Sequence, residues 1–328
     1  MSDRGVVAVL HGEVPAGAPA DEQDVLVEVR HVSAALEELG YHPVPLAVSL
    51  DLQSMARHLG EQAPVAVFNL VESLAGRDVL QHLAPSVIET LGIAHTGSGA
   101  DAVYCTTNKH LAKQIMTASG IPTPAWQRCD DLVQQGAAFG PAYMVKLTSE
   151  DASRGISDSS VKAAEGELLA WARGLSPAER SRYIVEQFVP GREFNISVLD
   201  GPDGPQVLPP AEMTFVDYPP GKPEIVGFSA KWDSDSFEYH HTVRRFEFGG
   251  EDTRLLERLR TLAQRSWKAF GLAGYARVDF RVDPSGRPWV LEANINPCLS
   301  PDGGFVAASQ RAGMTYVQVI ERIMATAK

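Results

Sequence analysis

The chain has 328 residues, 44% of them hydrophobic and 21% charged, with a formal net charge of −12. The composition is ordinary for a globular protein, and the length is enough for about two or three lobes. The negative charge argues against a broad nucleic-acid surface, because such a surface needs basic groups to neutralise phosphates. No run of about 18 apolar residues is present, so we expect no membrane-spanning helix. The three cysteines lack metal-ligand spacing and the first apolar run is too short for a signal peptide, which predicts a cytoplasmic protein.

The first part of the chain alternates short apolar runs with helical patterns. We expect, in order, a strand at 5–10, a helix over 24–40, strands at 42–48 and 64–70, and a helix–strand unit at 86–99. The first helix ends at Gly40, because glycine is the usual residue after a helix C-terminus. Strands and helices in alternation indicate a doubly wound α/β lobe, which we expect to end near residue 98.

The rest of the chain has a different texture, with longer strands separated by single helices. We expect a helix over 108–120, a strand at 142–147, a helix at 168–175, and strands at 183–189 and 193–199. A Pro-rich segment at 216–239 is expected to be a mobile loop, followed by a helix over 251–270, a hairpin over 275–296 and a C-terminal helix over about 303–327. This pattern indicates α+β lobes with antiparallel sheet.

The hairpin carries the most informative polar pattern. Its turn, "DPSG", has favourable turn chemistry, and we expect Arg277 to pair near Glu292 and Asp279 near Val290. One face would then be apolar, with Val278, Phe280, Val282, Trp289, Leu291 and Ala293. The other face would carry Arg277, Asp279, Glu292 and Asn294. Neighbouring carboxylates repel unless a positive group lies between them, and oxygen ligands suit Mg²⁺ with phosphates. A solvated face with an Arg277–Glu292 ion pair is the alternative.

Other segments offer contacts for a nucleotide. Lys109 opens a helix, Lys146 ends an apolar strand and Lys231 lies in the Pro-rich segment. The segment "SEDASRGIS" has small residues whose backbone N–H groups can cover phosphates. In "YIVEQFVPGREF" the backbone can meet an adenine edge, and Glu193 follows at a suitable distance for a ribose hydroxyl. Each of these features, taken alone, also fits a surface lysine, an ordinary loop or an ordinary strand.

Together these segments resemble the ATP-grasp superfamily, and within it the D-alanine–D-alanine ligases. The similarity covers nearly the whole chain and is most specific in "IVEQFVPGREF" and "YARVDFRVDPSGRPWVLEANINP". It implies a three-lobed α/β and α+β fold: an N-terminal doubly wound α/β lobe at 1–98, a central α+β lobe at 99–188 and a C-terminal α+β lobe with antiparallel sheet at 189–328. It also implies a homodimer that acts on small carboxylate and amine substrates. From the net charge and the apolar runs we expect binding to neither nucleic acid nor membrane.

The resemblance also implies roles for individual residues. ATP phosphates would be bound by Lys109, Lys146 and Lys231, with Ser153 and Asn294 as further nucleotide contacts. The adenine would lie against Glu186, Gln187 and Val189, and the ribose against Glu193. Two Mg²⁺ ions, with Mn²⁺ as the alternative metal, would be held by Asp279, Glu292 and Asn294. Arg277 would stabilise an acyl phosphate and a tetrahedral intermediate, with Lys231 and Ser153 as further catalytic groups.

The chain departs from the family pattern around the second substrate. Ala152 stands where the family's loop has a serine, and Trp232 stands where a tyrosine joins that serine and an N-terminal glutamate. The family's carboxylate-binding serine aligns near Gly303, which has no side chain to offer. We therefore expect the acceptor, a neutral or cationic amine or an amine within the same molecule, to lie against Arg277, Cys298, Leu299, Ser300 and Asp302. Cys298 is expected to be structural, because no histidine stands beside it in the sequence.

These features favour an ATP-dependent carboxylate–amine ligase that forms an amide through an acyl phosphate, on a non-standard amino-acid substrate. The first alternative is a true D-alanine–D-alanine ligase of cell-wall synthesis. The second, from another class, is an ATP-binding regulator without ligase activity. Arg277, Asp279, Glu292 and Asn294 occur together, which argues against the regulator, because a sensor needs only the ATP slot.

Overall fold

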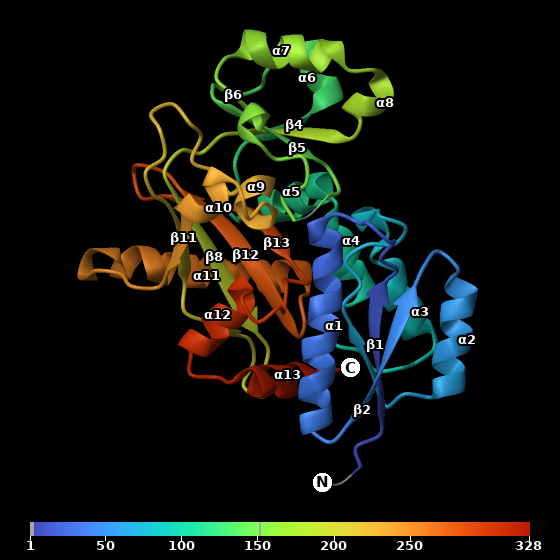
Figure 1. Ribbon diagram of the computed structural model, residues 1–328. Helices are drawn as coiled ribbons and strands as arrows, with labels where there is room; N and C mark the ends of the chain where they lie inside the picture. The colour runs from blue at the N-terminus through green and yellow to red at the C-terminus, as the bar shows by residue number, and fades with distance from the viewer. Residues whose placement is uncertain (1–2, 151) are drawn as a thin grey trace.

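The computed structural model describes residues 3–150 and 152–328. Within these residues the strands form three sheets, and the three parts of the chain surround a common centre (Figure 1). The predicted fold class is confirmed: a parallel α/β lobe is followed by antiparallel sheets with helices. Residues 98 and 188 fall between sheets, and the lobe boundaries at these positions stay a prediction. None of the described helices is both long and apolar enough to cross a lipid bilayer.

The N-terminal lobe has a parallel sheet in the order β2-β1-β3. Its central strand β1 (Val6–Gly12) is almost wholly buried, as its continuous apolar run leads one to expect. The helix α1 (Ala20–Glu38) begins earlier than predicted, and the strand expected after residue 90 is reduced to one bridge between Val67 and His95. The other elements are β2 (His42–Val48), α2 (Leu52–Gln62), β3 (Ala66–Asn69), η1 (Asp78–Leu80) and α3 (Leu83–Thr90).

The central sheet has the order β4-β7-β5-β6, with helices packed on one face (Figure 1). In β5 (Tyr143–Leu147), Tyr143 and Val145 pack against those helices. Side chains alternate along a strand, so Met144 and Lys146 point to the opposite face, toward the centre of the molecule. The other elements are α4 (Ala100–Thr107), α5 (Lys109–Ala118), β4 (Trp126–Arg128), α6 (Cys129–Gln135), η2 (Asp158–Ser160), β6 (Val161–Lys162), α7 (Glu165–Gly174), α8 (Pro177–Arg180) and β7 (Tyr183–Gln187).

The C-terminal part contains the largest sheet, in the order β11-β10-β8-β12-β13, with β9 beside β8. The helix α11 (Thr253–Phe270) covers one face, where Leu259 and Trp267 join a core cluster with Phe194 and Val278. The opposite face turns toward the other lobes. The other elements are β8 (Arg192–Leu199), β9 (Gln206–Val207), β10 (Ala211–Phe215), α9 (Phe228–Trp232), α10 (Phe237–His241), β11 (Thr242–Arg245), η3 (Gly250–Asp252), β12 (Tyr275–Val282), β13 (Pro288–Asn294), α12 (Gly304–Arg311) and α13 (Tyr316–Ala325).

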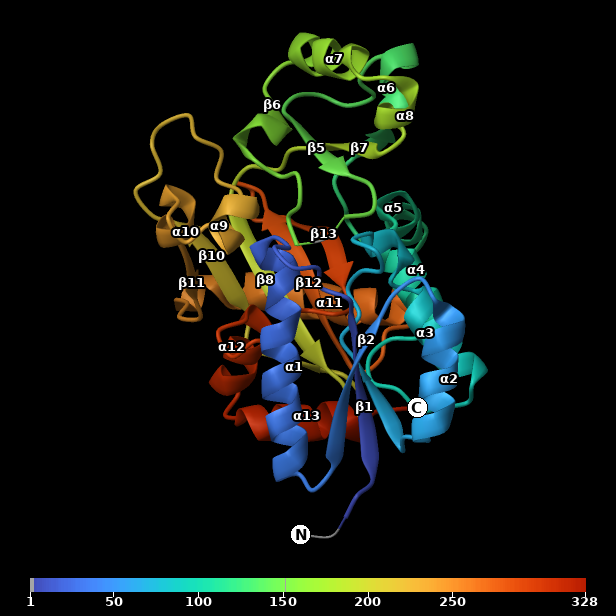
Figure 2. The ribbon, with the colours of Figure 1, turned by 45° about the vertical axis from the view of Figure 1, so that its right-hand side comes forward.

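Two predicted elements differ in the structure. The Pro-rich segment 216–239 contains α9 and the start of α10, so it is less irregular than expected. The single C-terminal helix is two helices, because Gly313 has φ 89° and Thr315 starts α13 with a capping box. Figure 2 shows α13 beside α1, and their apolar side chains share one core cluster. The C-terminus of the chain therefore supports its first helix.

The hairpin β12–β13 forms as predicted, but its register is different. Arg277 lies opposite Asn294 and Asp279 opposite Glu292, and the register shifts after Asp279 so that Phe280 lies opposite Val290. This β-bulge leaves Leu291 as the extra residue. Leu291 therefore points into the central cavity rather than into the core, whereas Ala293 keeps its predicted place on the apolar face. The predicted apolar face was wrong at Leu291 and Trp289, because neither belongs to the core cluster that covers this hairpin.

Candidate active site

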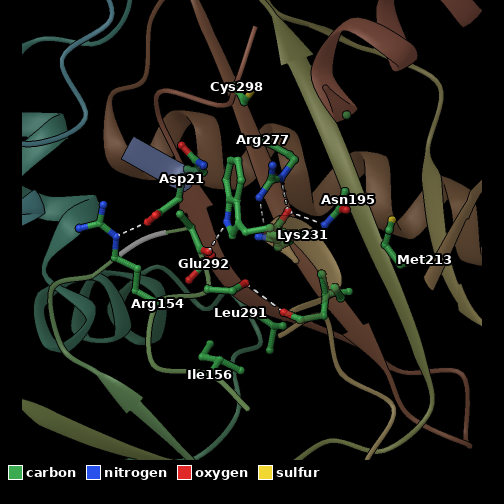
Figure 3. A pocket seen from close by; sticks show the side chains of 18 of the residues that line it. Asp21, Arg154, Ile156, Asn195, Met213, Lys231, Arg277, Leu291, Glu292 and Cys298 are labelled. Atoms are coloured by element: carbon green, nitrogen blue, oxygen red, sulfur yellow. Dashed lines mark hydrogen bonds and ion pairs between the residues drawn. The ribbon is translucent and has the colours of Figure 1, made fainter. Parts of the chain in front are cut away.

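A cavity of about 630 Å³ lies where the three parts of the chain meet (Figure 3). It is lined by residues of α1, of the central sheet and of the hairpin β12–β13. Most of the predicted site residues line it, namely Lys146, Ser153, Glu186, Gln187, Val189, Glu193, Lys231, Arg277, Asp279, Glu292, Asn294, Cys298 and Asp302. Lys109, Leu299 and Ser300 lie outside the lining. The Lys109 amino group donates to the Glu150 carbonyl at 2.6 Å, and Ser300 donates to a carboxylate of α1. Leu299 is buried in a core cluster, so its predicted place in the acceptor pocket was wrong.

The polar face of the hairpin is tightly organised around Asp279. Arg277 donates to both of its oxygens, from Nε at 2.7 Å and from Nη2 at 2.8 Å, and Asn195 on β8 donates to Oδ1 at 2.8 Å (Figure 3). An ionised carboxylate has about four lone-pair positions, so these bonds leave Asp279 about one for a cation. Asn195 was not predicted, although a polar residue within the apolar run "EFNISVL" was a signal for it.

Glu292 lies across the strand pair from Asp279 and among several cations. Burial alone would raise the pKa of Glu292, but Lys109, Lys146, Lys231 and Arg277 lower it to about 2. The approach to Lys109 is long, 3.9 Å from Nζ to Oε2. Glu292 is therefore a permanently ionised oxygen donor in a strongly positive setting, which is the setting that bound phosphates need.

The oxygen donors of this face fit a hard divalent cation. Asp279 and Glu292 are cross-strand partners, and Asn294 is two residues further along β13, opposite Arg277. The Asn294 side-chain oxygen accepts the Asn296 N–H at 2.9 Å, and an amide oxygen has a second lone pair for a metal. Carboxylate and amide oxygens together are the donor set that suits Mg²⁺ or Mn²⁺.

Glu186 is buried between two lysines on the cavity side of the central sheet. Its Oε2 lies 3.1 Å from Lys146 Nζ and its Oε1 lies 3.3 Å from Lys113 Nζ. Burial opposes ionisation of Glu186, but the two lysines lower its pKa, and burial lowers the pKa of Lys113 to about 8. Glu186 and Lys113 are therefore both charged at neutral pH. Lys113 was not predicted, because a single lysine in an amphipathic helix is usually exposed.

Glu193 is also buried and lies beside an arginine that the sequence did not single out. Arg281 Nη1 donates to Glu193 Oε2 at 2.9 Å, and Arg281 Nε donates to the Val189 carbonyl at 2.9 Å. Burial raises the pKa of Glu193, and Arg281 opposes that rise. Arg281 thus orients the carboxylate and links the strand predicted for adenine to the hairpin.

The loop predicted to cover phosphates is joined to the segment that carries Lys231. Residue 151 of this loop lies outside the described residues. Ala152 and Ser153 have φ of 53° and 61°, a left-handed conformation that costs energy for residues other than glycine. The joining hydrogen bonds run from Ser153 Oγ to the Val226 carbonyl (3.0 Å), from the Phe228 N–H to the Ile156 carbonyl (3.0 Å) and from Trp232 Nε1 to the Ala152 carbonyl (3.1 Å).

Arg154 ties the same loop to the N-terminal lobe (Figure 3). Its Nε lies 2.5 Å from Asp21 Oδ2, its Nη2 lies 3.2 Å from Glu22 Oε1, and its Nη1 lies 3.5 Å from Asp78 Oδ1. Asp21 and Asp78 are buried, so these contacts are little screened by water. The loop is held over the cavity from two sides, by the Lys231 segment and by α1.

Arg154→Gln is expected to release this loop. Amide hydrogen exchange at residues 152–157 should become at least about 10-fold faster. Removing the arginine leaves buried carboxylates without a partner, which destabilises the closed position of the loop. The KM for ATP should rise in the same variant if the loop covers the phosphates. Arg180→Gln, which removes an ion pair to Asp130 elsewhere in the central lobe, is the control. Exchange that stays equally slow in Arg154→Gln would contradict this role.

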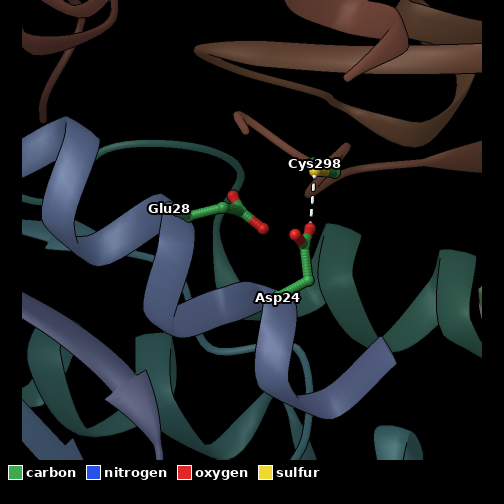
Figure 4. Close-up of side chains that lie close together, drawn as sticks. All are labelled: Asp24, Glu28 and Cys298. Atoms are coloured by element: carbon green, nitrogen blue, oxygen red, sulfur yellow. Dashed lines mark hydrogen bonds between the residues drawn. The ribbon is translucent and has the colours of Figure 1, made fainter. Parts of the chain in front are cut away.

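Asp24, Glu28 and Cys298 form a cluster, and Asp24 and Cys298 of this cluster line the cavity (Figure 4). Cys298 Sγ donates to Asp24 Oδ2 at 3.0 Å, and Ser300 Oγ donates to Asp24 Oδ1 at 3.1 Å. Burial raises the pKa of the Cys298 thiol well above its ordinary value, and Glu28 and Asp24 add to the rise. A thiol that stays protonated is a poor nucleophile, which supports the structural role expected for Cys298.

Glu28→Gln is expected to flatten the pH dependence of stability. Burial raises the pKa of Glu28 from 4.5 to about 8, against the Leu299 N–H that donates to it at 2.9 Å. Protonated Glu28 is favoured in the folded state, because the pKa of Glu28 is higher there than in the unfolded chain. Its contribution to the free energy of unfolding is therefore complete below about pH 4.5 and is lost as pH rises through 8. The loss is at most about 1.4 kcal/mol per pH unit in this window.

Urea unfolding at several pH values between 5 and 8 measures that slope. The slope should be smaller in Glu28→Gln than in the wild type, and it should be unchanged in Glu37→Gln, which alters an exposed glutamate of the same helix. Equal slopes in the wild type and Glu28→Gln would show that Glu28 titrates as it does in the unfolded chain.

Arg244 is a further cation of the cavity lining, near Cys298 and Arg277, and the sequence did not point to it. It lines the cavity from β11, and its Nη1 lies 3.4 Å from the Asp302 carbonyl. Burial lowers the pKa of Arg244, and the nearby Arg277 lowers it further. Asp302 itself is exposed, so its carboxylate is a weaker barrier to an anion than the sequence suggested.

Comparisons with known proteins point to one family. A family model described as the D-Ala–D-Ala ligase C-terminus matches residues 115–325. The D-alanine–D-alanine ligase of Gloeobacter violaceus is 30% identical over 319 residues, covering 95% of this chain and 97% of that protein. The one of Methylococcus capsulatus is 30% identical over 326 residues, covering 98% and 96%.

Solved structures support the fold. The D-alanyl-alanine synthetase A of Vibrio cholerae matches with a TM-score of 0.73 at 18% identity, covering 99% of both chains. The D-alanine–D-alanine ligase of Bacillus anthracis, solved in complex with ATP, matches with a TM-score of 0.71 at 21% identity, covering 98% of this chain and 96% of that one. With the family match and the relatives above, these findings show that the chain belongs to the D-alanine–D-alanine ligase family of the ATP-grasp superfamily, a family of ATP-dependent carbon–nitrogen ligases.

Proposed function

We propose that this ligase joins a carboxylate to an amine through an acyl phosphate, and that its substrate pair differs from two D-alanines. The observation that carries the proposal is the polar face of β12–β13, where Arg277, Asp279, Glu292 and Asn294 meet the cavity together with Lys146 and Lys231. Phosphoryl transfer needs positioning and neutralisation of charge more than covalent help from the protein, and this face supplies both.

The residues divide into a nucleotide part and a metal part. We assign the adenine to Glu186 and Gln187 of β7 and to Val189 just after it, and the ribose to Glu193. We assign phosphate contacts to Lys146, Lys231, Ser153 and Asn294. Lys109 lies outside the cavity lining and contributes its charge beside Glu292, 3.9 Å away. Asp279, Glu292 and Asn294 would hold two Mg²⁺ ions, which supply neutralisation of phosphate charge when bound.

The chain's own groups account for the rest of the reaction. Arg277 is fixed by its two hydrogen bonds to Asp279, so its guanidinium is oriented before any substrate arrives. An acyl phosphate carries charge on its phosphoryl oxygens, and attack by an amine develops charge on the former carbonyl oxygen. Arg277 and Lys231 both line the cavity and would stabilise both charges, and the loops over the cavity would keep water away from the acyl phosphate.

Several contacts around the second substrate support a non-standard pair. The Trp232 indole binds a loop carbonyl in the place of the family's tyrosine triad, and Arg154 supplies a different anchor for the loop. Cys298 and Ser300 both donate to Asp24, so the Ser300 hydroxyl is not free to bind a substrate carboxylate. The relatives, at about 30% identity, are named D-alanine–D-alanine ligases. Strict D-alanyl-D-alanine synthesis is therefore the alternative that the test must distinguish from a non-standard substrate pair.

The test is an ADP-release assay with ATP, Mg²⁺ and pairs drawn from a panel of D- and L-amino acids, with product masses measured. The expected result is release of ADP with a product whose mass is that of the two substrates less one water. Efficient formation of D-alanyl-D-alanine in preference to other pairs would overturn the substrate assignment. Tight ATP binding without ADP release for any pair would overturn the reaction.

A further inference from the structure

Two adjacent arginines on β11 point to opposite faces and have different surroundings. Arg245 pairs with Glu212 at 2.7 Å, on the face where Glu212 also binds Arg192. Arg244 lies on the other face, opposite Met213, whose side chain also lines the cavity (Figure 3). Among the residues that the structure describes, no carboxylate oxygen lies within 4 Å of the Arg244 guanidinium. The cavity therefore contains a partly buried cation that forms no ion pair with the described residues, although the exposed Asp302 carboxylate attracts it from farther away.

The surroundings of Arg244 favour an anion from outside the chain. Arg277 is a second guanidinium close enough to lower the pKa of Arg244, so the two cations repel each other even though Arg277 is paired with Asp279. Asp302 turns its main-chain carbonyl toward Arg244, at 3.4 Å. A buried or half-buried charge is costly unless it is paired, so a ligand carboxylate beside Arg244 would be favoured.

Two glycines at the start of α12 line the cavity near Arg244. A Cβ on Gly304 would lie 3.4 Å from Arg244 Nη2, and a Cβ on Gly303 would lie 2.8 Å from the Cys298 and Ser300 carbonyls. Gly303 is also the N-cap of α12 and gives that helix no side-chain cap. The start of α12 therefore lies beside the guanidinium in the cavity lining, and a helix N-terminus and a guanidinium both favour negative charge.

We propose that Arg244 binds the α-carboxylate of the acceptor amino acid and so restricts the second substrate to amines that carry one. The inference rests on the proposed ligase function and names the chemistry of its acceptor. It replaces the sequence-based expectation of a neutral or cationic acceptor, because that expectation did not include Arg244. Arg244 takes over the role of an anchor that Gly303 cannot fill, and the guanidinium fork matches a carboxylate with two N–H donors.

The test compares free amino acids with their α-amides as acceptors. The probes are D- and L-alanine, D- and L-serine and glycine, each also as the α-amide, with ATP and Mg²⁺. In the wild-type enzyme the free acid should exceed its amide in kcat/KM by at least about 30-fold, as for a close charge pair lost at an interface. In Arg244→Gln the acceptor KM for the free acid should rise at least about 30-fold and the preference over the amide should disappear.

Arg245→Gln is the matched control, because it removes the same group from the adjacent residue on the outer face. Its acceptor preference should equal that of the wild type, and Arg244→Lys should recover part of the preference because it keeps the charge. The first half-reaction is measured separately by trapping the acyl phosphate with hydroxylamine, which forms an acyl hydroxamate and releases phosphate.

The two measurements separate the two proposals. Hydroxamate formation with an unchanged preference for the free acid in Arg244→Gln would overturn the role of Arg244 and leave the ligase function standing. A wild-type enzyme that accepts the amides as well as the free acids would also overturn it. Absence of hydroxamate with every amino acid of the panel would overturn the ligase function and this inference with it.

Discussion

Glu292→Gln is expected to lower the rate of ADP formation by at least about 10³-fold. The carboxylate has a pKa of about 2 because Lys109, Lys146, Lys231 and Arg277 overcome the effect of burial. Glutamine keeps the shape but has no charge, so it can neither hold a divalent cation firmly nor offset the lysines around the phosphates. The assay couples ADP release to NADH oxidation at saturating ATP, over a range of Mg²⁺ concentrations.

Glu247→Gln is the control for this variant, because Glu247 is an exposed glutamate whose ion pair to Arg311 lies at the surface. It should retain wild-type turnover, and far-UV circular dichroism should show that both variants are folded. Near-normal turnover in Glu292→Gln would remove the hairpin from the mechanism. If high Mg²⁺ restores the lost activity, the effect lies in metal affinity rather than in the phosphoryl-transfer step.

The sequence predicted the elements of the fold better than their register and limits. Strands such as β2 and β7 are short apolar runs bounded by Pro, Gly or polar residues, and these signals are local. The bulge after Asp279 is not local, since it depends on how β13 meets both β12 and the cavity. The break at Gly313 was readable in principle, because a glycine followed by a Thr-x-x-Gln capping box marks the end of one helix and the start of another.

The candidate site shows the same division between local and long-range information. Asp279, Glu292 and Asn294 stand out in the sequence because they are polar residues within apolar strands. Arg281 and Arg244 are also in strands, but their roles come from partners far along the chain, such as Glu193 and the start of α12. Periodicity assigns each residue to a face, whereas only tertiary packing decides which faces meet.

Lys113→Met is expected to lower the free energy of unfolding by roughly 3 kcal/mol or more. Lys113 is almost fully buried, and it donates to the Thr123 hydroxyl and the Leu291 carbonyl as well as pairing with Glu186. Methionine fills similar space but leaves Glu186 with Lys146 alone. An ionised carboxylate with reduced compensation in the protein interior is far more costly than the loss of an exposed ion pair. Urea unfolding at pH 7, below the pKa of about 8 for Lys113, measures the difference.

Lys162→Met tests whether the cost comes from burial rather than from the loss of a lysine. Lys162 pairs at 3.5 Å with Glu167, whose side chain is 51% exposed, so its loss should cost less than about 1 kcal/mol. The double variant Lys113→Met with Glu186→Gln should recover part of the lost stability, because it removes the uncompensated charge. If the double variant is less stable than Lys113→Met alone, the cost lies in the hydrogen bonds of Lys113 to Thr123 and Leu291 rather than in its charge.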